Sequence, residues 1–226
     1  MKCVGETYRV SGFISLLFIL FVGYSSFACA NQWDTYFQNQ LTEPPEQFII
    51  SGLKRIPSAG HGSVAIDLGS GVGHETKLLL DRGYKVFAVD ANERALHYMQ
   101  YLPGISKHKS NLKTINSKFE NLNFANLPRA DLIISSFALP FVSKGNFHRV
   151  WENISNKIKP GGYVIINLFD AKFSFYNNKH NMSFHSKSEA LALLKGFKVI
   201  EFRTVRSDSE KSNAKSIYYV IVAQKL

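Results

Sequence analysis

Cysteine is scarce in this chain of 226 residues, since Cys3 and Cys29 are its only two and both lie within the first thirty positions. The rest of the chain therefore offers neither a disulfide framework nor a cysteine-based zinc site. The seven histidines show no spacing typical of metal ligands, so we expect no metal site. Acidic residues are also few, 17 against 27 lysines and arginines, and the formal charge of +10 suits an anionic partner as well as plain solubility.

What the chain does have is a composition typical of a globular protein. Hydrophobic residues make up 45% of it and charged residues 19%, far from the profile of a disordered chain. A length of 226 residues predicts one domain with an appendage.

The appendage is the N-terminal segment. No charged residue lies between Arg9 and Asp34, and positions 13–22 are almost entirely Phe, Ile, Leu and Val. Small residues ending in Ala28-Cys29-Ala30 follow, which is typical of a signal peptide cleaved after Ala30. A lipidated Cys29 and an uncleaved anchor stay open as alternatives, although the apolar part is short for a spanning helix of about 20 residues. We therefore interpret residues 1–30 as a signal peptide or membrane anchor and residues 31–226 as one folded domain.

Short apolar runs alternate with helical stretches in that domain, which predicts an α/β fold. The runs at 63–68 and 84–90 are typical of buried parallel strands, and 73–82 predicts a helix closed by Gly83. The remaining predicted elements are strands at 131–135 and 162–168, a helix at 146–157, a break at 159–162, a helix from 186 to 194, and strands at 197–205 and 216–224. The last two strands, joined by a polar connection, are expected to form a hairpin.

A glycine-rich loop, residues 67–73, follows the first strand and opens the first helix. Glycines in that place let backbone N–H groups approach a ligand closely. The third glycine, Gly73, comes one residue too early for a dinucleotide fingerprint, and no Lys-Ser/Thr pair follows, which excludes a P-loop. Asp90, at the end of the second strand, can accept hydrogen bonds from two ribose hydroxyls, and Asp67 can hold an ammonium group. The loop thus predicts a ligand that carries both a ribose and an amino acid.

That description fits S-adenosylmethionine (SAM). Segments 65–73, 86–90, 130–135 and 159–163 resemble the successive motifs of class I SAM-dependent methyltransferases, and the resemblance extends over about residues 33–226. Three more segments, 136–141, 167–169 and 182–185, are similar to a small bacterial branch near the tellurite-resistance type methyltransferases. The resemblance implies a three-layer, Rossmann-like methyltransferase fold with a seven-stranded, mostly parallel sheet and a C-terminal antiparallel hairpin.

The resemblance also implies the residues that bind the cofactor. They comprise the loop at the methionine end, the ribose acid, the residues flanking the adenine and a serine that closes the site. These are Asp67, Leu68, Gly69, Gly71, Gly73, Asp90, Ala91, Phe119, Glu120 and Ser135. Phe119 and Glu120 occupy the place of the adenine-flanking pair, where the family more often has an aspartate.

Methyl transfer from a sulfonium is an in-line displacement with an activated leaving group, so it needs orientation rather than a protein nucleophile. A general base helps only a protonated acceptor, and no residue is singled out; the candidates by position are His148, Asp170, Tyr176 and His185. Residues 135–140 stand where enzymes that methylate base amines carry Asp/Asn-Pro-Pro-Tyr/Phe, which argues against a DNA amino-methyltransferase. We expect methyl transfer to a small molecule, with nucleic acid a disfavoured acceptor.

Two other functions stay open. One is a noncatalytic SAM-binding module held at a membrane, and the other is an RNA methyltransferase, which the positive charge favours. Localisation is also open. Lys2 and Arg9 before the apolar run, with Asp34 and further acids after it, predict export, whereas use of SAM predicts a cytoplasmic enzyme.

Overall fold

The computed structural model describes residues 37–172, 182–208 and 215–226, so the predicted signal peptide or anchor lies outside the described residues. The chain divides into two compact units, residues 1–43 and 44–226. Within the first unit, residues 37–40 are helical and a turn follows. None of the helices in the described ranges is long and apolar enough to cross a membrane.

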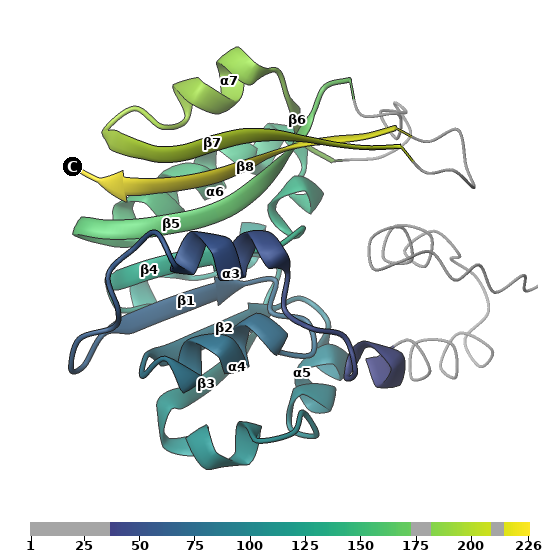
Figure 1. The fold of residues 1–226 in the computed structure, drawn as a ribbon, viewed down its shortest axis with the longest axis vertical. Helices are drawn as coiled ribbons and strands as arrows, with labels where there is room; N and C mark the ends of the chain where they lie inside the picture. Colours follow the sequence, from purple (N-terminus) through teal and green to yellow (C-terminus); the bar gives the residue numbers. More distant parts are fainter. Residues whose placement is uncertain (1–36, 173–181, 209–214) are drawn as a thin grey trace, which may run out of the picture. The chain divides into compact units, whose positions relative to one another are not determined.

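The second unit is built on one sheet in the order β3-β2-β1-β4-β5-β8-β7, with a short β6 paired to β5 beside that path (Figure 1). The strands are β1 Val64–Leu68, β2 Lys85–Asp90, β3 Leu112–Asn116, β4 Ala130–Ser135, β5 Ile158–Asp170, β6 Phe184–His185, β7 Phe197–Asp208 and β8 Lys215–Lys225. Strands β1 to β6 run parallel, and β8 is antiparallel to both β5 and β7. The predicted mostly parallel sheet with a C-terminal hairpin is confirmed. The seven predicted strands correspond in number to the main path, and β6 adds an eighth strand to the sheet.

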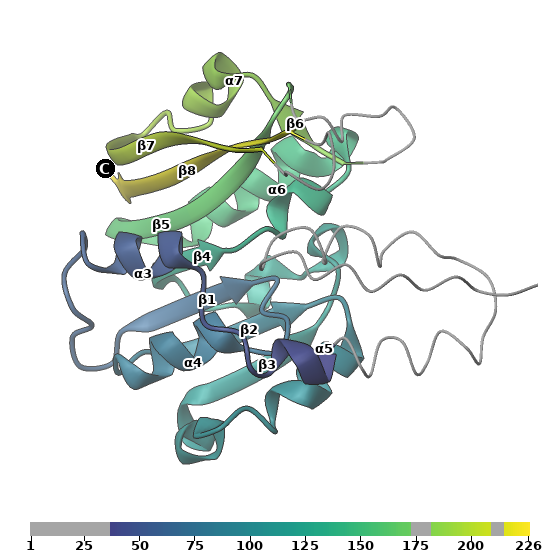
Figure 2. The same ribbon diagram turned by 45° about the vertical axis from the view of Figure 1, so that its right-hand side comes forward.

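Helices cover both faces of this sheet, which makes three layers (Figures 1 and 2). The helices are α3 Gln47–Leu53, α4 His74–Asp81, α5 Glu93–Met99, α6 Lys144–Lys157 and α7 Lys187–Ala192, with short 3-10 turns η1 Ile105–Asn111, η2 Phe119–Asn121, η3 Phe124–Asn126 and η4 Leu139–Phe141. Gly52 of α3 packs on Ile165 and Val222, whereas α6 and α7 share a buried cluster with residues of the opposite face such as Ile166 and Ile221. Successive strand residues alternate between faces, so these contacts assign α3 to one layer and α6 and α7 to the other.

The break predicted at 159–162 is wrong. β5 runs from Ile158 through this segment, and its register with β4 shifts between Ala130 and Leu132. Gly161 adopts φ +78° there. A glycine with positive φ allows a bulge, so Pro-Gly-Gly bends the strand instead of ending it.

Candidate functional site

The glycine-rich loop lies where β1 ends, and we call this side, where β1, β2, β4 and β5 end, the carboxyl edge. The N–H groups of Gly69 and Ser70 donate to the carbonyl of Val89 in β2, at 2.8 and 3.0 Å. Gly69, Gly71 and Gly73 have φ of +81°, +51° and +96°. Residues with a side chain rarely adopt such values, so this tight path accounts for the three glycines.

The three glycines differ in what surrounds them. A Cβ added to Gly69 would lie 2.0 Å from Cβ of Ala138, and one added to Gly73 would lie 2.5 Å from Cγ of Met99. A Cβ added to Gly71 would meet no atom within 4 Å. Gly69 and Gly73 are therefore required by packing against the protein itself, whereas Gly71 borders open space.

Asp90 lies beside that space at the end of β2. Its Oδ2 accepts a hydrogen bond of 2.8 Å from Gly71 N–H, and its Oδ1 accepts one of 2.8 Å from Asn92 N–H. Burial raises the pKa of Asp90, and the backbone N–H groups of Asn92, Gly71 and Ala91 oppose that shift. A carboxylate has about four acceptor positions, so Asp90 keeps capacity for two hydroxyl groups. The Asn92 side chain caps α5 by accepting from Arg94 N–H at 3.0 Å.

Asp67, the acidic residue of the loop, is deeply buried, with 1% of its surface exposed. Its Oδ2 accepts a hydrogen bond of 2.6 Å from Thr76 Oγ1, and Oδ1 has no partner among the described residues. Burial first, then the charges of Glu75 and Asp90, raise the pKa of Asp67 to about 8, against the opposing hydrogen bond from Thr76. A buried carboxyl with an unpaired oxygen lacks a positively charged partner, and the ammonium group of an amino acid would supply one.

The remaining predicted binding residues have mixed placements. Phe119 borders the loop, because its Cζ lies 3.6 Å from where a Cβ at Gly69 would be, and Ala91 is exposed directly after Asp90. Ser135 is fully buried, and its hydroxyl donates to the carbonyl of Leu68 at 2.8 Å, which ties β4 to β1. Glu120 Oε1 accepts from Ser143 N–H at 3.2 Å, at the start of α6. The loop, Asp90, Ala91 and Phe119 are thus brought together, while the side-chain contacts of Ser135 and Glu120 are made within the protein.

Of the candidate bases, two lie next to each other. Asp170 and His185 are register partners in β5 and β6, whereas His148 is exposed on α6 and Tyr176 lies outside the described residues. Asp170 accepts hydrogen bonds from the Tyr219 hydroxyl and, at 2.6 Å, from Lys172 N–H.

The protonation states of this region are set by burial. Burial and the neighbouring Asp170 carboxylate raise the pKa of Tyr219, so its hydroxyl stays protonated. Burial lowers the pKa of His185, so its ring is neutral at pH 7, and its Nδ1 has no partner among the described residues.

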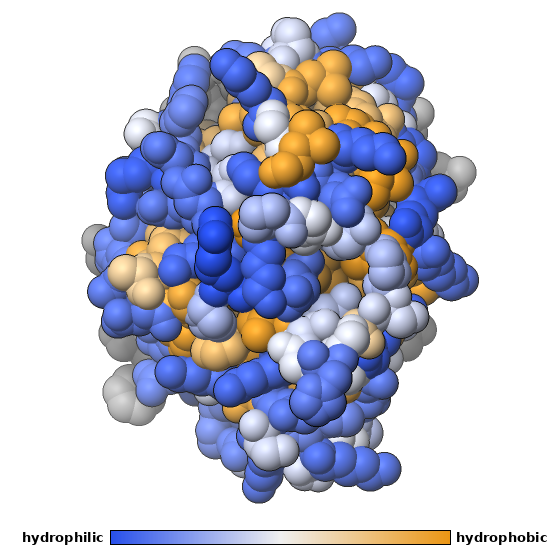
Figure 3. Space-filling view, turned by 90° about the vertical axis from the view of Figure 1, so that its left-hand side faces the viewer, coloured by the Kyte–Doolittle hydropathy of each residue, from blue (hydrophilic) through white to orange (hydrophobic). Residues whose placement is uncertain are grey.

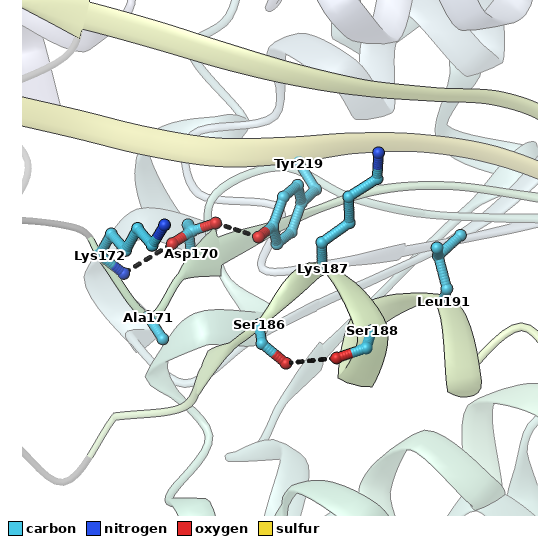
Figure 4. A pocket seen from close by; sticks show the side chains of 8 residues that line it. All are labelled: Asp170, Ala171, Lys172, Ser186, Lys187, Ser188, Leu191 and Tyr219. Carbon is cyan, nitrogen blue, oxygen red and sulfur yellow. Dashed lines mark hydrogen bonds between the residues drawn. The ribbon is translucent and has the colours of Figure 1, made fainter.

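A hollow of about 500 Å³ lies beside Asp170 (Figure 4). Its lining combines the end of β5, the first turns of α7 and one residue of β8: Asp170, Ala171, Lys172, Ser186, Lys187, Ser188, Leu191 and Tyr219. The lining thus combines the Asp170 carboxyl with hydroxyl and lysine side chains, and the ammonium group of Lys187 lies over the Phe202 ring, 5.9 Å from its centroid. In the described ranges no three His, Cys, Asp or Glu side chains are arranged to hold a metal ion.

Comparison with known proteins shows the family to which the chain belongs. Residues 54–204 match the family model of the tellurite resistance protein TehB. This chain belongs to the TehB family. The matched segment runs from the end of α3 into β7, so it contains the glycine loop and Asp90. None of the curated protein sequences matches this TehB-family chain.

Solved structures show the same fold at low sequence identity. TehB from Haemophilus influenzae is 18% identical with a TM-score of 0.65, over 80% of this chain and 62% of that one. This chain therefore spans less than two thirds of that protein. A SAM-dependent methyltransferase from Methanosarcina mazei is 19% identical (TM-score 0.60, 81% and 99% coverage). The Burkholderia thailandensis 1,6-didemethyltoxoflavin-N1-methyltransferase, solved with its acceptor and S-adenosylhomocysteine, is 17% identical (TM-score 0.60, 90% and 93% coverage).

This TehB-family chain has the same Rossmann-like fold as these methyltransferases. The residues present fit the cofactor. Open space borders Gly71, Asp90 has free acceptor capacity, and Asp67 has a buried oxygen without a partner among the described residues.

Sequence reasoning did not identify Thr76 or Tyr219, although a small hydroxyl residue in the first turn after a glycine loop was a usable signal for Thr76.

Proposed function

We propose that this TehB-family chain transfers the methyl group of SAM to a small-molecule acceptor at the carboxyl edge of the sheet. The observation that carries the proposal is the conjunction, around one loop, of open space at Gly71, a carboxylate with acceptor capacity at Asp90 and a buried oxygen at Asp67 that has no partner among the described residues. Bound SAM would supply a methyl group already activated by its sulfonium. The protein's part is to hold and orient the reactants and to keep water out.

On the cofactor side, each binding residue has its own task. Asp90 takes the ribose, Asp67 faces the ammonium end, and the Gly71 backbone leaves room between them. Phe119 borders the same loop and offers a ring face to the adenine.

On the acceptor side, we propose Asp170 or His185 as the proton acceptor, and their pairing in register at the ends of β5 and β6 supports this choice. His185 suits this task because its lowered pKa leaves the ring neutral at pH 7. The adjoining hollow, with Lys172 and Lys187 on its rim, is large enough for a small acceptor that carries polar groups.

Part of the positive charge that would favour an RNA acceptor lies away from the glycine loop. Lys85 and Lys113 are exposed at the amino ends of β2 and β3, with their ammonium groups 5.9 Å from the Phe87 ring centroid. Figure 3 shows the side of the second unit on which the amino ends of the parallel strands lie, and hydrophilic residues cover most of it. A strand of five residues is about 16 Å long, so a polyanion bound to these lysines would lie far from the glycine loop.

Methyl-labelled SAM, incubated with the purified full chain, tests the proposal. Three acceptor sources are compared: the small-molecule fraction of a cell extract, its RNA fraction, and inorganic tellurite, which the family's name suggests. Label transferred to extractable small products supports the proposal, and the Gly71→Val variant serves as the blank. Label in RNA alone selects the RNA methyltransferase, and SAM binding without turnover on any source selects the noncatalytic module.

A further inference from the structure

Phe137 has an unusual backbone conformation. It lies in the turn between β4 and η4, and among the described residues it is the only non-glycine residue with positive φ, at +49°. A bulky side chain disfavours this region, so the surrounding structure must hold Phe137 there. Such strained residues cluster at functional sites, and this one lies at the carboxyl edge.

Asn167 makes a hydrogen bond that helps to hold it there. Oδ1 of Asn167 accepts a hydrogen bond of 2.6 Å from Phe137 N–H. The Asn167 side chain is fully buried in β5 between apolar neighbours, and its Nδ2 has no partner in the described part of the chain. Burying an amide with an unsatisfied donor is unfavourable, so packing alone would favour an apolar residue at this position.

The turn also contacts the cofactor loop. Cβ of Ala138, the residue after Phe137, lies 2.0 Å from where a Cβ of Gly69 would be. The Ala138 methyl group therefore occupies the space beside Gly69 and supports the loop. The Phe137 ring packs edge-on against Phe48 and Tyr218, with centroid distances of 5.6 and 5.3 Å, and so cannot swing away freely.

We propose that Asn167 is a positioning residue of the methyl-transfer site. By accepting the Phe137 N–H, it keeps Phe137 in the left-handed conformation and thereby seats Ala138 against Gly69. This inference rests on the proposed SAM site, since the loop that it positions is the one that would bind the cofactor.

A double-mutant cycle on the full chain tests the proposal, with S-adenosylhomocysteine affinity measured by calorimetry as the readout. Asn167→Leu removes the acceptor but keeps the size, and we expect affinity to fall about tenfold as Phe137 relaxes to negative φ. Phe137→Gly removes the need for the restraint, because glycine adopts positive φ freely. In the Phe137→Gly background, Asn167→Leu should therefore change affinity by less than about twofold.

Two controls separate positioning from stability. Asn167→Asp, measured at pH 5 so that its buried carboxyl stays protonated, keeps an acceptor oxygen and the shape, and it should preserve affinity. It stands in for the cycle if Asn167→Leu fails to fold, and a tenfold loss in folded Asn167→Asp would then overturn the proposal. Thermal melts accompany every titration. Equal losses of affinity in both Phe137 backgrounds, or a lower melting temperature with unchanged affinity, also overturn it. If the wild-type chain binds no S-adenosylhomocysteine, the proposed function itself is wrong. If the wild-type chain binds it and Asn167→Leu binds it equally well, only the role of Asn167 is wrong.

Discussion

The backbone N–H of Gly71 donates a hydrogen bond of 2.8 Å to Oδ2 of Asp90. The bond joins the turn after β1 to the last residue of β2, so two sequence motifs form one structural unit. The acid proposed to take the ribose also fixes the loop that would surround the methionine end. Substitutions at either residue are therefore expected to affect both the binding of the ribose and the conformation of the glycine loop.

Asp90→Ala should weaken S-adenosylhomocysteine binding more than tenfold. It removes a charged acceptor for two hydroxyls, and each such bond contributes about 1.5–3 kcal/mol. Asp90→Asn, which keeps one acceptor oxygen but loses the charge, should fall between wild type and Asp90→Ala. Calorimetry measures this, and unchanged affinity in a folded Asp90→Ala protein would remove the ribose assignment.

Gly71→Val should abolish cofactor binding without unfolding the protein, because the new side chain would fill the space beside the loop. Gly83→Val is the matched control, since Gly83 has φ +88° and open space for a Cβ but lies in the turn after α4. Both variants should lose similar stability in a circular dichroism melt, and only Gly71→Val should lose binding. Retained binding in Gly71→Val would show that the loop is only a turn.

The ligand-free protein should lose stability as pH rises, in part through Asp67. The pKa of Asp67 is raised from 3.8 to about 8, so between these values the folded state keeps a proton that the unfolded state has released. The free energy of unfolding then falls with rising pH across that window. Asp67→Asn cannot ionise, so melts at pH 5 and pH 8 should differ less for this variant. An identical pH dependence in both proteins contradicts the shifted pKa.

Glu120→Ala should act on stability more than on cofactor binding. Glu120 Oε1 accepts the N–H of Ser143, which precedes α6 and is itself buried. Losing this bond should cost about 1 kcal/mol, or about 2–4 °C in melting temperature. Glu152→Ala, on the exposed side of α6, is the control. A large loss of cofactor affinity with an unchanged melting temperature would instead indicate that Glu120 contacts the cofactor.

We propose that residues 1–30 direct the domain to or across a membrane. The apolar run at 13–22 and the small residues before Asn31 support this proposal. N-terminal sequencing of protein from fractionated cells should find a start at Asn31 or a lipidated Cys29. An intact Met1 in the soluble cytosolic fraction would contradict the signal-peptide interpretation.

The regular parts of the fold follow from local patterns. Continuous apolar runs predicted β1, β2 and β4 to within one residue, because strands buried on both faces need them. Edge strand β3 escaped prediction because its exposed residues include Lys113 and Thr114. Helices α3 and α5 were also missed, since seven residues carry too little periodicity to stand out.

The sequence by itself determined the glycine loop, the two acids Asp67 and Asp90, and the elements with long apolar runs such as β1, β2 and β4, since each depends on neighbours along the chain. Only the tertiary structure decided which distant groups meet. It paired Asn167 with Phe137 N–H, the Tyr219 hydroxyl with Asp170, and Glu120 with Ser143 N–H. These contacts join residues 23 to 49 positions apart. Their geometry depends on how strands and helices pack, which no local pattern of residue types encodes.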